Sequence, residues 1–94
     1  MKVIWSAASV RHLQEVVEYI QPESPRGATT VRRRILVTVK RIGQVPQSGR
    51  TGRIGGTREA VVPGTAYIVV YQISVQRIEI LGVWHGARRW PVSI

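Results

Sequence analysis

The chain has 94 residues, which is enough for one modest hydrophobic core and predicts a single domain over residues 1–94. It contains no cysteine and only two histidines, so disulfides and thiolate zinc sites are excluded and we expect neither a metal nor a cofactor. It shows no leader peptide and no apolar run of membrane-spanning length. We therefore expect a cytoplasmic protein with no membrane partner.

Charge is the strongest global feature of the composition. Fourteen Lys plus Arg residues stand against five Glu and no Asp, which gives a formal net charge of +9. Twelve of these cations are arginine, whose planar guanidinium can form two hydrogen bonds with one carboxylate or phosphate. The composition predicts a polyanionic partner, either a nucleic acid or an acidic protein. The alternative is a basic surface that serves only solubility.

The chain begins with a predicted strand and helix. Residues 2–5 are mostly apolar and favour a short strand. Ser6 then suits the N-cap of a helix over 7–20, in which apolar residues recur every three or four positions. Pro22 follows the end of this helix.

A second helix is predicted over 25–42. Ser24 is a suitable N-cap, Pro25 fits the first helical position, and Gly43 suits the C-terminal stop. The joint between the two helices is short, so they should form an antiparallel hairpin. The many arginines of the second helix favour a solvated face over a dedicated binding site.

Residues 44–56 are rich in Gly and contain two arginines, so we interpret them as a flexible linker. A phosphate-binding loop is a weaker interpretation, because the spacing differs from that of a nucleotide-binding loop. Three strands should follow, over 57–62, 67–73 and from Arg77 onward. Pro63-Gly64 favours a type II turn, and the tight connections predict an antiparallel meander.

The last strand leads into a cationic and aromatic segment. Its apolar run ends at His85-Gly86, and Arg88, Arg89 and Trp90 follow before Pro91 prevents further strand pairing. We expect these residues to form a working surface at the end of the sheet.

The residues in this order resemble the RelE/ParE superfamily of toxins from bacterial type II toxin–antitoxin modules. The resemblance covers almost the whole chain and depends on three stretches: Gly56-Thr57-Arg58-Glu59, Tyr67 to Tyr71, and Trp84 to Pro91. It implies an α+β fold in two layers, β-α-α-β-β-β, with the helix hairpin packed on a small and mainly antiparallel sheet. It also implies a cognate antitoxin, ParD-like in the ParE branch, in a complex of higher order.

The superfamily divides by target, and the resemblance leaves both branches open. ParE-like toxins inhibit DNA gyrase, and we expect this activity. RelE-like toxins cut mRNA on the ribosome, which requires a general base, a general acid and cations for the developing charge. A nuclease would draw on Arg58, His85 and Arg88, with Glu59 as another acid or base. A plain nucleic-acid-binding domain is a weaker third possibility.

Several features favour the non-catalytic branch. RelE-like sites usually use lysines around the meander and a tyrosine in the tail, whereas this chain has only Lys2 and Lys40 and carries Trp90 in the tail. Arg58 and Glu59 are consecutive, so on a strand their side chains should point to opposite faces. We therefore predict target binding, without firm catalytic residues, by the set Arg58, His85, Arg88, Arg89 and Trp90. His85 could equally be a half-buried structural residue, and Arg58 could be the strand partner of Glu79.

Overall fold

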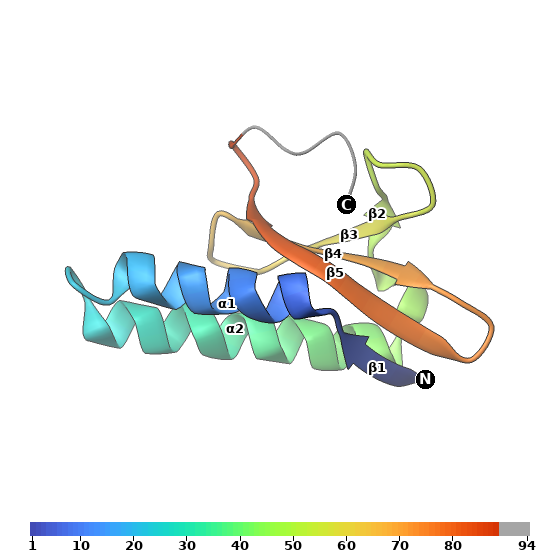
Figure 1. Ribbon diagram of the computed structural model, residues 1–94, viewed down its shortest axis with the longest axis horizontal. Coiled ribbons are helices and arrows are strands. Elements are labelled where there is room, and N and C mark those ends of the chain that lie inside the picture. The colour runs from blue at the N-terminus through green and yellow to red at the C-terminus, as the bar shows by residue number, and fades with distance from the viewer. Residues whose placement is uncertain (89–94) are drawn as a thin grey trace.

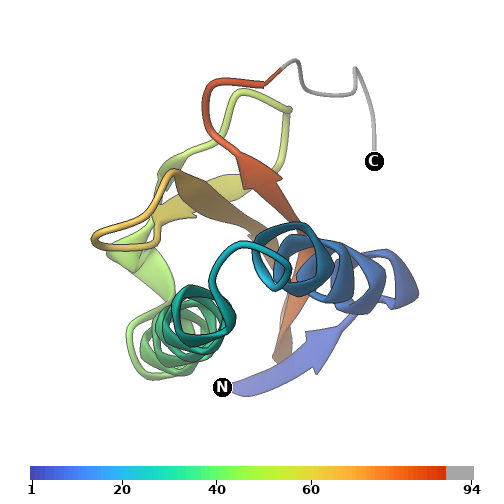
Figure 2. The same ribbon diagram turned by 90° about the vertical axis from the view of Figure 1, so that its left-hand side faces the viewer.

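The computed structural model describes residues 1–88, in which two helices pack on one face of a five-stranded sheet (Figure 1). Figure 2 looks along the helix pair and shows both helices on the same side of the sheet. The elements, in chain order, are β1 (Lys2–Trp5), α1 (Ala7–Ile20), α2 (Pro25–Gln44), a 3₁₀ turn η1 (Pro46–Ser48), β2 (Arg50–Thr51), β3 (Arg58–Val61), β4 (Tyr67–Ile73) and β5 (Arg77–His85). The predicted α+β class and two-layer arrangement are confirmed.

The strand order is β1-β5-β4-β3-β2, and only the β1–β5 pair is parallel. The first strand therefore lies beside the last one, with Lys2 opposite Arg77. Parallel neighbours need a long crossover, and here the helix hairpin and the meander supply it. Since the other pairs are antiparallel, the mainly antiparallel sheet is confirmed.

The predicted N-caps of the two helices and the predicted turn at Pro63-Gly64 are present in the structure. The Ser6 hydroxyl accepts a hydrogen bond from the Ser9 amide at 3.0 Å, and the Ser24 hydroxyl accepts one from the Gly27 amide at 2.9 Å. These bonds satisfy amides that the first helical turn leaves without partners. Gly64 has a φ of +74°, as a type II turn requires at that position.

Two predictions for the region around the end of α2 differ from the structure. The second helix continues to Gln44, two residues beyond the predicted end at 42. Gly43 acts as a packing residue inside the helix, because a side chain there would collide with Val3 of β1. Residues 44–56 are also more ordered than a flexible linker, since they contain η1 and the edge strand β2.

The core lies between the helix hairpin and the inner face of the sheet. Its fully buried side chains include Ile35 and Ile42 from α2, Tyr71 from β4, and Ile78 and Ile80 from β5. Val, Ile and Tyr fill this space in a chain that has no Phe. All five residues from Tyr67 to Tyr71 are buried, so both faces of β4 are covered.

Candidate functional site

His85 is the last residue of β5, and the turn that follows it is fixed by backbone hydrogen bonds. The Gly86 amide donates to the Ala66 carbonyl at 2.7 Å, and the Arg88 amide donates to the His85 carbonyl at 3.1 Å. The imidazole Nδ1 accepts from the Ala87 amide at 3.2 Å, and the ring meets Tyr67 edge-on at 5.5 Å. His85 is thus half-buried and held in one orientation.

Arg88 turns back toward α1. Its guanidinium carbon lies 5.2 Å from the centre of the Tyr19 ring, a cation–π arrangement. The side chain of Tyr19 is exposed, and Arg11 and Glu15 form an ion pair at 3.6 Å on the same helix. A pocket of about 200 Å³ lies between α1 and the end of β5. We call it the His85 pocket, and its polar or aromatic residues include His12, Glu15, Tyr19, Tyr67, His85 and Arg88.

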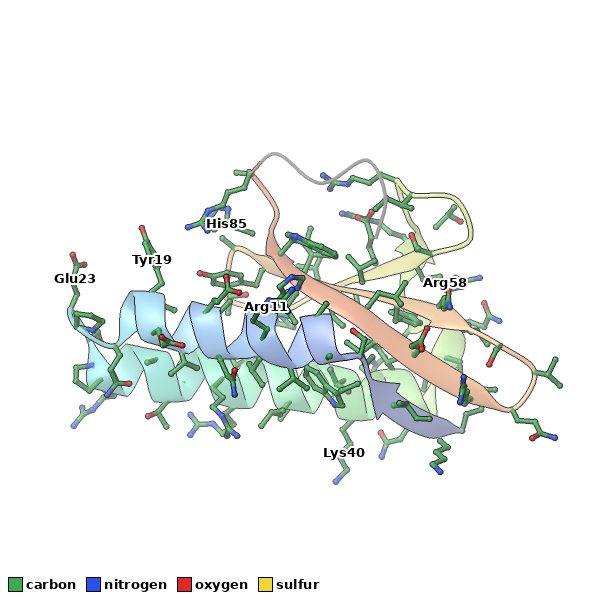
Figure 3. The ribbon with its side chains drawn as sticks, viewed as in Figure 1. Arg11, Tyr19, Glu23, Lys40, Arg58 and His85 are labelled. Atoms are coloured by element: carbon green, nitrogen blue, oxygen red, sulfur yellow. The ribbon has the colours of Figure 1, made fainter. Side chains whose placement is uncertain are left out.

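Arg58 lies in a different place. It is opposite Tyr71 on β4, whereas His85 is opposite Tyr67 on the other side of the same strand. The two residues are therefore four positions apart along the sheet and two strands apart across it. With about 3.3 Å per residue and about 4.8 Å per strand, their Cα atoms are roughly 16 Å apart. Figure 3 shows Tyr19 and His85 toward one end of the long axis and Arg58 toward the other.

The Arg58 side chain supports the segment before β2, because its Nη1 donates to the Gly49 carbonyl at 2.7 Å. The expected pairing of Arg58 with Glu79 is wrong. Strand β4 separates β3 from β5, and Gln72 stands opposite Glu79 and donates to it at 3.0 Å.

Glu59 points to the opposite face from Arg58 and is almost completely buried. Its carboxylate accepts three hydrogen bonds: from the Arg50 guanidinium at 3.1 Å, and from the Arg53 amide and Nε at 2.7 and 3.2 Å. Burial alone would raise the pKa of Glu59. The hydrogen bonds from Arg53 and Arg50 outweigh this effect and hold the pKa below its ordinary value. Glu59 thereby ties the loop before β3 to the strand.

His12, which lines the His85 pocket, was not identified from the sequence. Its Nδ1 accepts a hydrogen bond from the Val83 amide at 3.2 Å, and the centre of its ring lies 4.8 Å from that of the Trp84 ring. Val83 lies beyond the stretch of β5 that pairs with β1, which ends at Ile80. Burial lowers the pKa of His12, and nearby Arg11 lowers it further while Glu15 opposes both effects. The helical spacing contained a signal, because His12 falls three residues after Ser9 and four before Val16, both buried.

The structure thus places the predicted site residues in two groups. His85 and Arg88 lie together at the His85 pocket, whereas Arg58 lies near β2. Arg89 and Trp90 are outside the described residues. Within residues 1–88, no three His, Cys, Asp or Glu side chains are grouped so that they could hold a metal ion. Over the same residues, no helix is both long and apolar enough to cross a bilayer.

Comparison with known proteins gives consistent results. Residues 3–90 match the family described as the ParE toxin of the type II toxin–antitoxin system parDE. The candidate toxin Y4kP of Sinorhizobium fredii is 39% identical over 90 residues, which cover 96% of this chain and 93% of that protein.

Two solved structures share the fold. A chain from the chromosomal ParDE toxin–antitoxin system of P. aeruginosa superposes with a TM-score of 0.82 at 20% identity, over 88% of this chain and 92% of that chain. A chain of the RelBE2 toxin–antitoxin complex of Mycobacterium tuberculosis gives a TM-score of 0.63 at 22% identity, over 89% and 95% of the two chains.

Proposed function

The chain belongs to the ParE toxin family of type II toxin–antitoxin systems, and from this premise we propose that it arrests growth by inhibiting DNA gyrase. In this proposal the toxin acts by contact and cuts no nucleic acid. Its working surface is the His85 pocket together with Arg88, continued by Arg89 and Trp90. A cognate ParD-like antitoxin neutralises it, a partner that accords with the toxin–antitoxin systems of the two structural neighbours.

The observation that carries the proposal is the separation of the candidate catalytic groups. Cleavage of RNA through its 2′-hydroxyl needs a base, an acid and cations around one phosphate. The Cα atoms of Arg58 and His85 are roughly 16 Å apart by strand geometry, and the Arg58 guanidinium donates to the Gly49 carbonyl, so the two side chains do not converge on one place. Glu59 already accepts three hydrogen bonds from arginines. The pair that stays together, His85 and Arg88, suits contact with a protein target, since arginine and aromatic residues often dominate binding energy.

The second candidate is the RelE-like ribosome-dependent endoribonuclease. One observation favours it: His85 and Arg88 are adjacent at a pocket and could supply a proton-transfer group and a cation. A nuclease that depends on His85 should lose about a hundredfold or more in rate when this residue becomes Gln.

Two parallel assays decide between the candidates. Purified toxin should inhibit supercoiling by purified gyrase, and it should leave a reporter mRNA intact on translating ribosomes when cleavage is followed by primer extension. Arg88→Ala should weaken the inhibition of supercoiling, whereas the matched control Arg77→Ala, at the far end of β5, should not. Codon-phased mRNA cleavage that disappears in His85→Gln, with supercoiling unaffected, would establish the nuclease instead.

A further inference from the structure

Strand β5 extends beyond its neighbour β1 in the sheet. The pairing of these two strands ends at Trp5 and Ile80, whereas β5 continues to His85. Among the described strands, only β4 pairs with β5 from Gly82 onward. The backbone that leads into the His85 pocket therefore needs other hydrogen-bond partners on the side of β1.

Two side chains at the start of the first helix supply these partners. The Ser6 hydroxyl donates to the Leu81 carbonyl at 3.4 Å, and Nδ1 of His12 accepts from the Val83 amide at 3.2 Å. Because Val83 is only 3% exposed, His12 and not solvent provides the acceptor for its amide. His12 thus takes the place that a residue of a neighbouring strand would have.

The residues that follow Val83 belong to the working surface. His85 ends the strand two residues later, and the Arg88 guanidinium carbon lies 5.2 Å from the centre of the Tyr19 ring. Helix α1 therefore contacts the end of β5 through His12 and contacts Arg88 through Tyr19. A movement of β5 away from α1 would separate Arg88 from Tyr19 and change the shape of the His85 pocket.

The bond to Val83 requires the neutral form of His12. In a neutral imidazole one ring nitrogen carries a hydrogen and the other accepts. Since Nδ1 is the acceptor here, the hydrogen is on Nε2. A protonated ring carries a hydrogen on both nitrogens, so Nδ1 would face the Val83 amide as one donor against another. Burial lowers the pKa of His12 below its ordinary value of 6.5, so the accepting form is the one present at pH 7.

The charged and titratable groups around His12 come from three elements and the turn after β5. On α1 itself, Arg11 lowers the pKa of His12 further, whereas Glu15 raises it. The groups that line the His85 pocket from β4, from β5 and from the turn are Tyr67, His85 and Arg88. Of all these groups, only Glu15 favours a charge on His12, because the arginines and a protonated His85 repel it.

We propose that His12 is a positioning residue, which holds the end of β5 so that His85 and Arg88 face the target, and that proton uptake by His12 releases them. This inference rests on the proposed function, because it takes the working surface at the His85 pocket to contact gyrase. The toxin should therefore bind its target best at pH 7 and above, and more weakly as the pH falls below 6.5.

Nuclear magnetic resonance of the toxin without gyrase tests the positioning directly. As the pH falls from about 7.5 to 5, the amide resonances of Val83 and Arg88 should shift with the same midpoint as the His12 ring. Glu15→Gln should move this midpoint to lower pH, because it removes the charge that favours protonated His12. In His12→Asn, where His85 still titrates, the shift at that midpoint should be absent. If Val83 follows His12 while Arg88 does not, β4 alone positions the turn and the proposal is wrong.

Inhibition of supercoiling by purified gyrase gives the second readout. At pH 7.5, His12→Leu removes the acceptor and should inhibit about tenfold more weakly than wild type. His12→Asn provides an amide oxygen as the acceptor and should recover most of this loss. Gln14→Leu, at an exposed position of the same helix, is the matched control and should change inhibition by less than about twofold.

The binding of toxin to immobilised gyrase, measured against pH, completes the test. Wild type should lose affinity below pH 6.5 relative to His12→Asn at the same pH, a comparison that cancels the pH dependence of gyrase itself. A folded His12→Asn that is as weak as His12→Leu would overturn the positioning role. If His12→Leu does not fold, the titration of wild type still decides. If wild type fails to inhibit gyrase while Arg88 follows His12, the proposed function fails and the positioning of Arg88 by His12 stands.

Discussion

Glu59 shows how an acidic residue in a strongly basic chain can have a structural role. Its carboxylate is buried, whereas the side chains of the two arginines that bind it are partly exposed. The arginines therefore compensate the negative charge of the carboxylate while their guanidinium groups stay in contact with solvent. The Arg53 amide completes the arrangement by fixing the backbone of the loop. Removing the charge should therefore affect the loop more than the core.

Replacing Glu59 by Gln should lower the free energy of unfolding by about 2 kcal/mol, the usual range for hydrogen bonds that involve a charged group. Chemical denaturation at pH 7 measures this change. Glu18→Gln on the exposed face of α1 is the control and should have an effect within about 0.5 kcal/mol.

The same residue makes an acid-dependent contribution. Because the folded-state pKa of Glu59 is lowered, its contribution is present above its ordinary pKa of 4.5 and is lost as the pH falls through the folded value. Wild type should therefore lose stability more steeply below pH 4.5 than Glu59→Gln does. Equal slopes for the two proteins would contradict the assignment.

His12 should give a second pH dependence in a higher range. Its folded-state pKa is lowered, so the unfolded chain takes up a proton near pH 6.5 before the native protein does. Stability is then complete above pH 6.5 and decreases as the pH falls toward the folded value. Urea unfolding between pH 7.5 and 5.5 should show this decrease in wild type and in His85→Gln, and it should be absent in His12→Gln.

At the scale of elements, one buried hydroxyl helps to hold the segment between α2 and β3. The Tyr71 hydroxyl donates to the Pro46 carbonyl at 2.7 Å and accepts from the Gly49 amide at 2.9 Å. Gly49 is needed for this approach, because a side chain there would collide with the Tyr71 ring. The hydroxyl thus joins η1 and the start of β2 to the central strand.

Tyr71→Phe should cost about 2 kcal/mol in the free energy of unfolding, since it leaves a buried amide and a carbonyl without their partner. Thermal denaturation measures the loss, and exchange of the Gly49 amide should accelerate. Tyr19→Phe, on an exposed side chain, serves as the control and should leave both quantities unchanged. A stable Tyr71→Phe protein with slow exchange at Gly49 would show that the ring alone holds the loop.

At the scale of the whole molecule, the excess charge is spread over separate surfaces. Arg88 lies at the end of β5 against Tyr19, whereas Arg33 and Arg41 line a separate hollow between α2 and β3. Since different residues line the two places, a change at one should leave the other intact.

Arg88→Glu should abolish growth arrest but change antitoxin affinity by less than about threefold. Arg33→Glu combined with Arg41→Glu, which changes charge away from the His85 pocket, should still arrest growth. Colony counts with and without co-expressed antitoxin, together with binding measured on the purified proteins, test both halves. If either variant lost both properties while folded, the two surfaces would not be independent.

Local chemistry determined much of this protein from the sequence alone. The caps at Ser6 and Ser24, the turn at Gly64 and the periodicity of the helices are interactions between residues close in the chain. For the same reason, the opposite directions of Arg58 and Glu59 were predictable from strand geometry. The charge excess was predictable from composition, because it does not depend on the fold.

Tertiary structure decided which of these residues meet. Pairing between distant segments placed β1 beside β5, ordered the loop through Tyr71 and Glu59, and set Arg58 far from His85. It also brought His12 and Tyr19 of α1 to the end of β5 and left Val61 at an open edge. Strand order and helix docking fix such contacts, and both arise from burial of the whole core, which no local pattern specifies.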